Sequence, residues 1–232
     1  MKKLIPFIII ASLIISCGKD HQGNMIVKGN IDGLKKGTLY LQKIQDTVLV
    51  SVDSVQLNGD SNFILSDNVE SPELYYITLG EVSSEKIPFF GEKGEITITS
   101  KLDRLATSAK ITGSANQLIL DEFKEVYKKF NNQQLDLIKG KFEAMKANDT
   151  DAELAAEDAG KKLLKRRYLY TTNFAIQHAD SEVAPFLALT ELYDANIKLL
   201  DTINNSLTKE IKVSKYGVKL NNYIEEIKSY NE

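Results

Sequence analysis

Residues 48–66, VLVSVDSVQLNGDSNFILS, contain the strongest local signal for the fold of this chain. Two runs rich in β-branched and aromatic residues flank Asn58-Gly59, a dipeptide favoured in tight hairpin turns because both residues tolerate positive φ. We therefore expect Val52 to Leu57 to pair with Asn62 to Ser66 as a hairpin. Similar β-rich runs occur on both sides of this stretch.

Turn residues separate eight such runs at the spacing typical of an all-β sandwich or barrel. Apolar residues alternate with polar ones along several runs, which predicts one apolar row per strand facing a common core. The expected strands are Met25 to Asn30, Thr38 to Lys43, Val48 to Leu57, Asn62 to Ser66, Leu74 to Leu79, Ile87 to Phe90, Glu95 to Ser100 and Ala109 to Ile111. The expected core rows are Leu39 and Leu41, Val48, Val50 and Val52, Phe63 and Leu65, Tyr76 and Thr78, and Ile96 and Ile98.

After Gly113 the pattern becomes helical. Ser114 and Gln117 have the spacing of a capping box, in which each side chain satisfies a free amide of the first turn. A helix is expected from there to about Gly140, with a buried stripe at steps of three and four residues. The stripe consists of Phe123, Val126, Tyr127, Phe130, Leu137 and Ile138.

Further helices are expected in the rest of the chain. A second capping box at Thr150 to Glu153 predicts a helix that buries Leu154, Leu164, Tyr168 and Ala175. Ser181 is the expected cap of a third helix, and Pro185 is tolerated there because it falls in the first turn. Strands followed by helices predict an α+β protein, with a β-rich domain at 25–113, an antiparallel sandwich or barrel, and a helical segment at 114–232.

The N-terminus has the layout of a secretory signal peptide. Lys2 and Lys3 precede an apolar run from Leu4 to Ile15, which at about 12 residues is shorter than the roughly 20 that a transmembrane helix needs. We expect residues 1–16 to be a signal peptide. Cys17, which follows this peptide, either carries lipid or is a chance cysteine after an ordinary signal peptide.

Residues 14–17, Ile-Ile-Ser-Cys, resemble the lipobox of bacterial lipoproteins, which implies lipid on Cys17. Residues 17–24 are then a lipidated cysteine and a polar tether, and two or three acyl chains would anchor the protein stably. Asp20 is the only acid near this anchor, so the acidic cluster that sends such lipoproteins to the cell surface in some lineages is missing. We therefore expect the protein to lie in the cell envelope, anchored to the outer membrane and facing the periplasm.

Composition excludes several functions. The chain is 43% hydrophobic and 26% charged, as globular proteins are. Loss of Lys2 and Lys3 leaves 27 bases against 32 acids, a net charge of −5, which argues against nucleic acid as a partner. Cys17 is the single cysteine, so its lipidation leaves no thiol for a disulfide or a redox pair.

The β-rich part resembles the domain-of-unknown-function family 4369, found in envelope lipoproteins of the Bacteroidota, often ahead of a thioredoxin-like thiol-disulfide domain. The resemblance covers about Met25 to Phe123. It implies an accessory domain on a lipid anchor; the thioredoxin-like part is absent here, and no catalytic residue carries over. The matching motifs are Ile26 to Ile31, Gly37 to Leu41, Val52 to Val55, Asn58 to Phe63, Gly91 to Ile98 and Ile111 to Asn116.

No pattern for catalysis, cofactor binding or metal binding is found. The chain has two histidines, His21 in the tether and His178 near a predicted helix end, and it lacks the serine elbow, P-loop and zinc-protease motifs. The acid pairs Glu92 with Glu95 and Asp53 with Asp60 could act on glycosides if they lay about 5–9 Å apart. Since all four lie in or beside turns, we expect them to be solvated. We therefore expect that the protein is not an enzyme.

Two further features favour structural interpretations. The basic run Lys161 to Arg167 could contact phosphates or an acidic partner, but acids four residues ahead of its lysines predict a solvated helix face with surface ion pairs. The run Pro88 to Phe90 could line a ligand groove, but its place in a predicted strand favours sheet core.

The sequence thus predicts a membrane-anchored, non-catalytic module that binds or scaffolds a partner protein. One alternative is a lipoprotein that binds a small molecule or glycan in an apolar pocket. Another is an accessory to thiol-disulfide exchange acting in trans, which only the family resemblance suggests.

Overall fold

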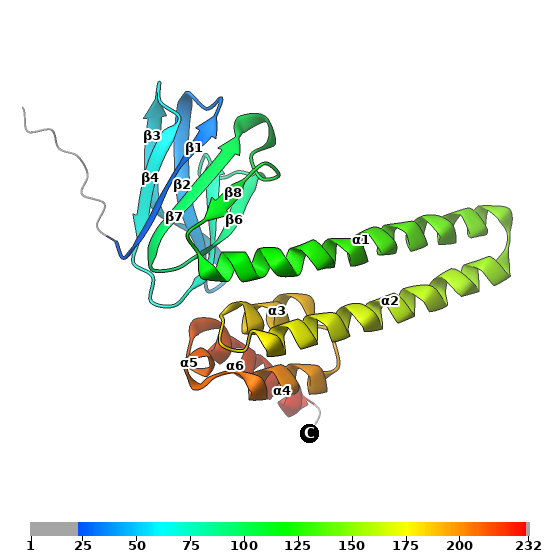
Figure 1. Ribbon diagram of the computed structural model, residues 1–232. Helices are drawn as coiled ribbons and strands as arrows, with labels where there is room; N and C mark the ends of the chain where they lie inside the picture. The colour runs from blue at the N-terminus through cyan, green and yellow to red at the C-terminus, as the bar shows by residue number, and fades with distance from the viewer. Residues whose placement is uncertain (1–22, 231–232) are drawn as a thin grey trace, which may run out of the picture.

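The computed structural model of the chain describes residues 23–230. The expected signal peptide, the expected lipid site Cys17 and His21 all lie outside the described residues. The described part begins with the β-rich domain and ends in the last helix, as Figure 1 shows.

Eight strands form a sandwich of two four-stranded sheets, and all eight predicted strands are confirmed (Figure 1). One sheet has the order β4-β1-β7-β8 and the other β3-β2-β5-β6. All neighbouring pairs are antiparallel except β1 and β7, which pair in parallel. The strands are β1 Met25–Asp32, β2 Lys36–Gln45, β3 Val48–Asn58, β4 Asn62–Asp67, β5 Glu73–Leu79, β6 Lys86–Gly91, β7 Gly94–Lys101 and β8 Lys110–Thr112.

The predicted hairpin of β3 with β4 is wrong. β3 pairs with β2 and β4 pairs with β1, so the turn at Asn58-Gly59 carries the chain from one sheet to the other. Gly59 has φ 99°, as the turn requires, and its N–H donates to the Lys35 carbonyl at 2.7 Å. The dipeptide forms a tight turn, but the two strands splay apart into opposite layers.

The sandwich core lies between the two sheets. Three of the expected rows are buried in it: Leu39 with Leu41, Phe63 with Leu65, and Ile96 with Ile98. The expected row on β5 is wrong, because Tyr75 and Ile77 face the core there instead of Tyr76 and Thr78. The expected row on β3 is confirmed only in part: Val52 packs against the core, but Val48 is 61% exposed at the outer end of the strand.

Six helices follow the sandwich, so the predicted α+β class is confirmed. The start of α1, the end of α2, α3 and the start of α6 lie against one end of the sandwich, next to β6, and α4 lies on their far side, as Figure 1 shows. They are α1 Ala115–Ala147, α2 Thr150–Gln177, α3 Val183–Glu191, α4 Ile197–Ser206, α5 Lys209–Lys212 and α6 Lys215–Tyr230.

The α1–α2 hairpin extends well beyond the other helices (Figure 1), and we call this projecting part the arm. α1 continues past Gly140 to Ala147, which is longer than expected. The expected buried stripe is wrong over the arm, because between Phe123 and Ala144 no α1 residue is fully buried and Ile138 is 57% exposed. On α2, Leu154 is likewise exposed, because only α1 packs against this half of the helix.

The helix caps differ in detail from the predicted ones. Ser114 caps α1 by accepting from the Gln117 N–H at 3.0 Å, but the Gln117 side chain turns to the sheet instead of completing the box. Asp149, one residue earlier than predicted, caps α2. At α3 the first residue before the helix is Glu182, although Ser181 Oγ does accept from the Val183 N–H at 3.1 Å.

An aromatic cluster joins the sandwich to the helices. Phe90 of β6 packs edge-on against Phe186 of α3, with ring centroids 5.3 Å apart, and Tyr216 of α6 contacts both. Phe89, one residue earlier, points the other way into the sandwich core. The sheet-core prediction for Pro88 to Phe90 is therefore confirmed for Phe89, while Phe90 belongs to the junction and Pro88 is exposed.

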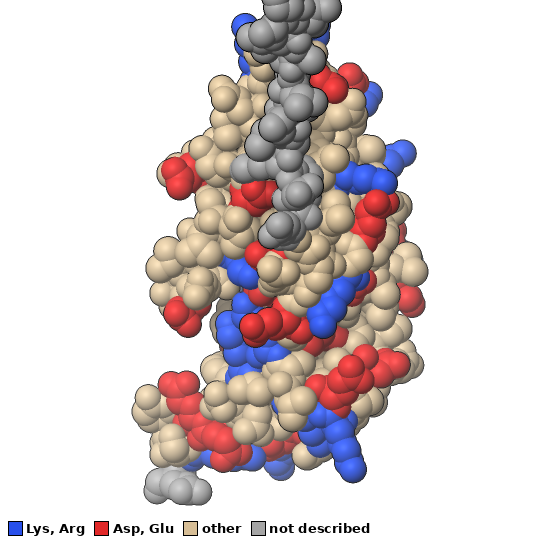
Figure 2. All heavy atoms as spheres, turned by 90° about the vertical axis from the view of Figure 1, so that its left-hand side faces the viewer, with Lys and Arg blue, Asp and Glu red and all other residues tan. Residues whose placement is uncertain are grey.

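The surface carries both signs of charge. Figure 2 shows acidic and basic side chains interspersed over the sandwich and the helices on one face of the molecule. Within residues 23–230, no helix combines the length and the apolar character that crossing a bilayer demands.

Candidate functional site

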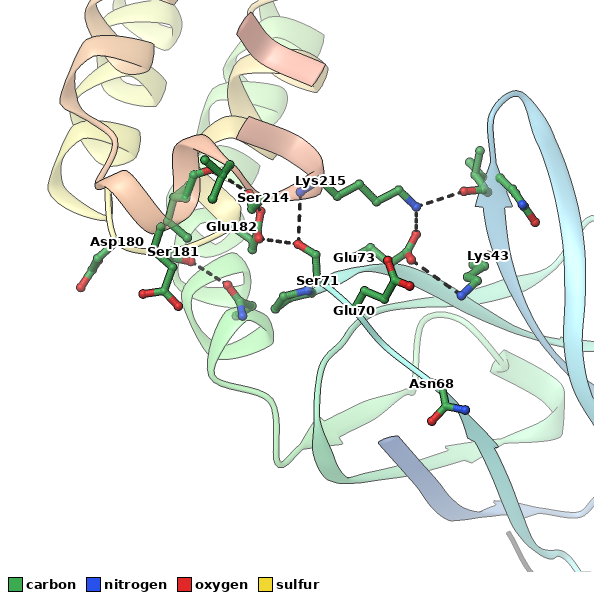
Figure 3. A pocket seen from close by; sticks show the side chains of 17 residues that line it. Lys43, Asn68, Glu70, Ser71, Glu73, Asp180, Ser181, Glu182, Ser214 and Lys215 are labelled. Carbon is green, nitrogen blue, oxygen red and sulfur yellow. Dashed lines mark hydrogen bonds and ion pairs between the residues drawn. The ribbon is translucent and has the colours of Figure 1, made fainter. Parts of the chain in front are cut away.

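A polar cleft lies where the β3-β2-β5-β6 sheet meets the helices (Figure 3). Its volume is about 820 Å³, within the usual range for ligand sites. Five segments line it: the end of β2, the loop before β5 with the first residue of that strand, the first turn of α1, the loop before α3, and α5 with its connection to α6. The lining residues are Lys43, Ile44, Gln45, Asn68, Glu70, Ser71, Pro72, Glu73, Asn116, Asp180, Ser181, Glu182, Glu210, Ile211, Val213, Ser214 and Lys215.

Glu182 lies at the centre of the inner wall, where the chain turns into α3. It is only 3% exposed, and its two carboxylate oxygens accept from Ser71 Oγ and Ser214 Oγ, each at 2.7 Å. Burial raises the pKa of Glu182, and the two serine hydroxyls oppose this shift by stabilising the charged form. One carboxylate thus ties the loop before β5 to the start of α6.

Glu73 begins β5 and is 7% exposed. Lys215, at the start of α6, forms an ion pair with one of its oxygens, and Lys43 of β2 lies 3.9 Å from the other. The main-chain N–H of Lys215 also donates to Ser71 Oγ at 3.2 Å. Figure 3 shows how these contacts link strand and helix across the cleft floor.

Lys43 has a second acidic partner within the sheet. Its Nζ lies 2.6 Å from Asp67 Oδ2, which also accepts from the Tyr75 hydroxyl at 2.7 Å. Burial raises the pKa of Tyr75, and the hydrogen bond to Asp67 raises it further, so this phenol stays protonated. Both lysines of the cleft are therefore already neutralised by Glu73 and Asp67.

Three acids at the mouth of the cleft remain open to solvent. Glu70, Asp180 and Glu210 are all exposed, and within residues 23–230 none of their carboxylates forms an ion pair. The lining holds five acids against two lysines. Because the lysines are paired inside, the mouth presents uncompensated negative charge.

Each acid of the two sequence-predicted pairs has structural partners of its own. Glu92 accepts from the Ala115 N–H and from the Asn116 side chain, so it holds the start of α1, and Glu95 pairs with Lys28 at 2.5 Å. Asp53 Oδ2 accepts from the Ser66 N–H at 2.9 Å. In the same way, Asp60 Oδ1 accepts from the Asn62 N–H at 3.0 Å. Glu92 therefore supports a helix start and Asp60 a turn, whereas Glu95 and Asp53 each connect two strands.

The other sequence candidates also have structural surroundings. His178 is the C-cap of α2, half-buried, with its ring 4.4 Å from that of Phe174. In the basic run, Lys161 pairs with Glu157 at 2.8 Å and Lys162 with Asp158 at 2.7 Å, which confirms the predicted surface ion pairs.

The chemistry that the cleft can support is ion binding by carboxylates. Its lining contains serines and acids but no histidine or cysteine. Among the described residues, no three side chains of histidine, cysteine, aspartate or glutamate are grouped so that they could hold a metal ion. The arrangement is suited to an organic cation with a short apolar portion, which Ile44, Pro72 and Val213 could contact.

Sequence reasoning missed this cleft entirely. Its main residues, Ser71, Glu73, Glu182, Ser214 and Lys215, come from three segments more than 30 positions apart. No local spacing rule connects them. The one available signal was Glu73, a charged residue at the start of an otherwise apolar strand run.

Fold and cleft define an α+β protein in which a β-sandwich and a helical part share a polar site at their junction. Residues 25–120 match a family model described as a domain of unknown function (DUF4369), and this part of the chain belongs to that domain family. The family resemblance of the sandwich is thereby confirmed. No curated protein and no solved structure matches the chain.

Proposed function

We propose that this protein is a non-catalytic binding module of the cell envelope, lipid-anchored through Cys17, which holds a basic segment of a partner protein in the junction cleft. The observation that carries the proposal is the excess of acid in the cleft, where Lys43 and Lys215 are both paired internally. A lysine or arginine side chain of a partner would restore the charge balance at the mouth. Such charge complementarity favours specificity and fast association.

The fixed framework of the cleft supports binding. Glu182 and Glu73 are buried and hydrogen-bonded or paired, so the inner wall keeps its shape without a ligand. The exposed Glu70, Asp180 and Glu210 can move towards a partner. Preorganised walls with adaptable charges at the rim reduce the ordering cost of association.

The decisive experiment compares two triple variants of the full chain. Glu70→Gln/Asp180→Asn/Glu210→Gln removes the mouth charges, and Glu125→Gln/Asp136→Asn/Glu226→Gln removes three other exposed acids far from them in the sequence or on other helices. The probe is the peptide acetyl-Ala-Lys-Ala-Arg-Ala-amide, titrated while amide NMR shifts of Ser71 and Ser214 are followed. We expect wild type and the control variant to bind it, and the cleft variant to bind at least about tenfold more weakly.

Three outcomes would contradict the proposal. The first is that the peptide leaves the amide shifts of Ser71 and Ser214 unchanged, and the second is that it binds both triple variants equally. The third is that spermidine binds in the cleft while the peptide does not, which would favour the small-molecule function. A protein isolated with the lipidated chain from native envelope counts as support only if the cleft variant fails to retain it.

A further inference from the structure

α1 carries a row of exposed apolar side chains on the arm. The arm is the part of the α1–α2 hairpin that projects beyond the other helices in Figure 1. The row, here called the arm stripe, consists of Leu135, Ile138, Phe142 and Met145, which are 64%, 57%, 58% and 54% exposed. Their steps of three, four and three residues put them on one side of the helix. This is the spacing of the a and d positions of a coiled coil, whose side chains are normally buried against another helix.

The arm stripe is short and narrow. Continuing the same spacing leads to Lys128 and Asn131 at one end and to Asp149 at the other, so the apolar row covers about 15 Å of helix. Helices that lie on membranes present a broad apolar face along most of their length. The dimensions of the stripe suit one helix packed alongside α1.

The flanks of the arm stripe are basic. Lys139 and Lys146 occupy the positions on one side that correspond to e in the heptad, and both are exposed. Lys141 occupies a g position on the other side and reaches Glu153 and Glu157 of α2 at 3.9 and 3.8 Å. The side next to Lys141 is thus occupied by α2, while the Lys139 side is open.

The open lysines are only weakly engaged within the chain. Lys139 lies 4.0 Å from the exposed Glu143, and Lys146 Nζ lies 4.5 Å from the centre of the Phe142 ring. Exposed pairs of this kind contribute little to stability because water and salt screen them. Both ammonium groups are free to meet a carboxylate of a partner.

Charge also argues against a second copy of this chain as the occupant. Residues at e and g face each other across a two-helix seam and decide which helices pair. An antiparallel pair of α1 helices would place Lys139 and Lys146 against the same lysines. A parallel pair would place them opposite Lys141 and Gln134, again without an acid.

We propose that the arm stripe docks an amphipathic helix of a partner protein that carries Glu or Asp beside its apolar row. The four apolar side chains supply the buried contact, and Lys139 and Lys146 select the acidic flank. This surface is separate from the junction cleft, so either proposal can fail alone.

The experiment uses the full chain and two labelled three-heptad peptides in fluorescence anisotropy. Both peptides have Leu at a and d; one has Glu and the other Lys at e and g. We expect the Glu peptide to bind at least about tenfold more tightly than the Lys peptide. Lys139→Glu/Lys146→Glu should reverse that preference, and Ile138→Ser/Phe142→Ser should abolish binding of the Glu peptide.

Leu118→Ser is the matched control, because Leu118 is also on α1 and 73% exposed but lies off the stripe. It should bind the Glu peptide as wild type does. Equal binding of the two peptides, or none of the Glu peptide, would overturn the proposal. Two further results would overturn it: dimerisation that rises with concentration, and adsorption to phosphatidylglycerol vesicles. Either one counts if Phe142→Ser removes it while the Glu peptide remains bound.

Discussion

The main-chain N–H of Phe90 donates a hydrogen bond to Gln117 Oε1 at 2.9 Å, which ties the edge strand β6 to the first turn of α1. The Nε2 of the same side chain donates to Asp121 Oδ1 at 2.7 Å, which fixes the orientation of the amide. Gln117 is buried, and Phe90 is fully buried among the junction aromatics. One glutamine therefore both satisfies an edge-strand donor and sets where the helices leave the sandwich.

Gln117→Ala should destabilise the protein by about 1–3 kcal/mol, because the buried Phe90 N–H would lose its acceptor. Urea unfolding followed by circular dichroism measures the change. Gln134→Ala on the exposed part of α1 is the control and should stay within about 0.5 kcal/mol of wild type. Equal effects of the two substitutions would show that the Phe90 contact adds nothing.

Lys215→Met should destabilise the junction by about 1–3 kcal/mol, since the buried Glu73 would keep only the more distant Lys43. Adding Glu73→Gln to this variant should recover part of the loss, because the uncompensated charge is then removed. A double-mutant cycle in urea unfolding gives the coupling. Strictly additive losses would mean that the ion pair does not hold the helices to the sheet.

Glu182→Gln should change how stability depends on pH. The pKa of Glu182 is raised in the folded state, so the folded chain keeps this proton to higher pH than the unfolded chain, whose value is near 4.5. The stability that the raised pKa of Glu182 gives to the folded chain is fully present below that pH. It is lost as the pH rises through the folded-state pKa.

The free energy of unfolding of Glu182→Gln should therefore increase relative to that of wild type as the pH rises from about 4.5. The increase should be at most about 1.4 kcal/mol per pH unit. Urea unfolding at a series of pH values measures the difference. Glu226→Gln, a solvated control, should show no such trend. A constant difference between Glu182→Gln and wild type would refute the raised pKa.

Much of the fold could be predicted because it is encoded locally. Alternation and turn residues located all eight strands, and the Ser114 cap located the start of α1. Pairing partners could not be read in the same way. The Asn58-Gly59 turn has the composition of a hairpin, but sandwich packing sends β3 and β4 into different layers.

Helix periodicity also misled in one place for a physical reason. Apolar spacing along α1 predicts a contact but does not identify the molecule that makes it. On the arm, the row from Leu135 to Met145 is left exposed by the rest of residues 23–230. The cleft could not be predicted from the sequence because Glu73, Glu182 and Lys215 come together only through tertiary packing. Segment composition gives no information on such long-range meetings.

Gly29→Ala and Gly140→Ala should have opposite effects. A Cβ at Gly29 would lie 1.7 Å from the Ile98 carbonyl oxygen in the neighbouring strand, so β1 and β7 would have to separate. We expect a loss of about 4 kcal/mol or more. Gly140 is on the arm with open space around its Cβ position, and alanine there should add about 0.5–1 kcal/mol of helix stability.

Thermal unfolding of the two glycine variants provides the comparison. A tolerated Gly29→Ala would contradict the close parallel pairing of β1 with β7. A destabilised Gly140→Ala would indicate that the arm is not a regular helix at that point.

Cys17→Ser should release the protein from the membrane fraction. Each buried methylene of an acyl chain contributes about 0.8 kcal/mol, so two or three chains on one residue hold a protein stably and their loss removes the whole anchor. Ser16→Ala, which keeps a small residue before the cysteine, is the matched control and should remain with the membranes. Mass spectrometry of the mature N-terminal peptide should find the added lipid on wild type and on Ser16→Ala. An unmodified sulfur at Cys17, or membrane retention of Cys17→Ser, would refute the anchor and leave a thiol available for redox chemistry.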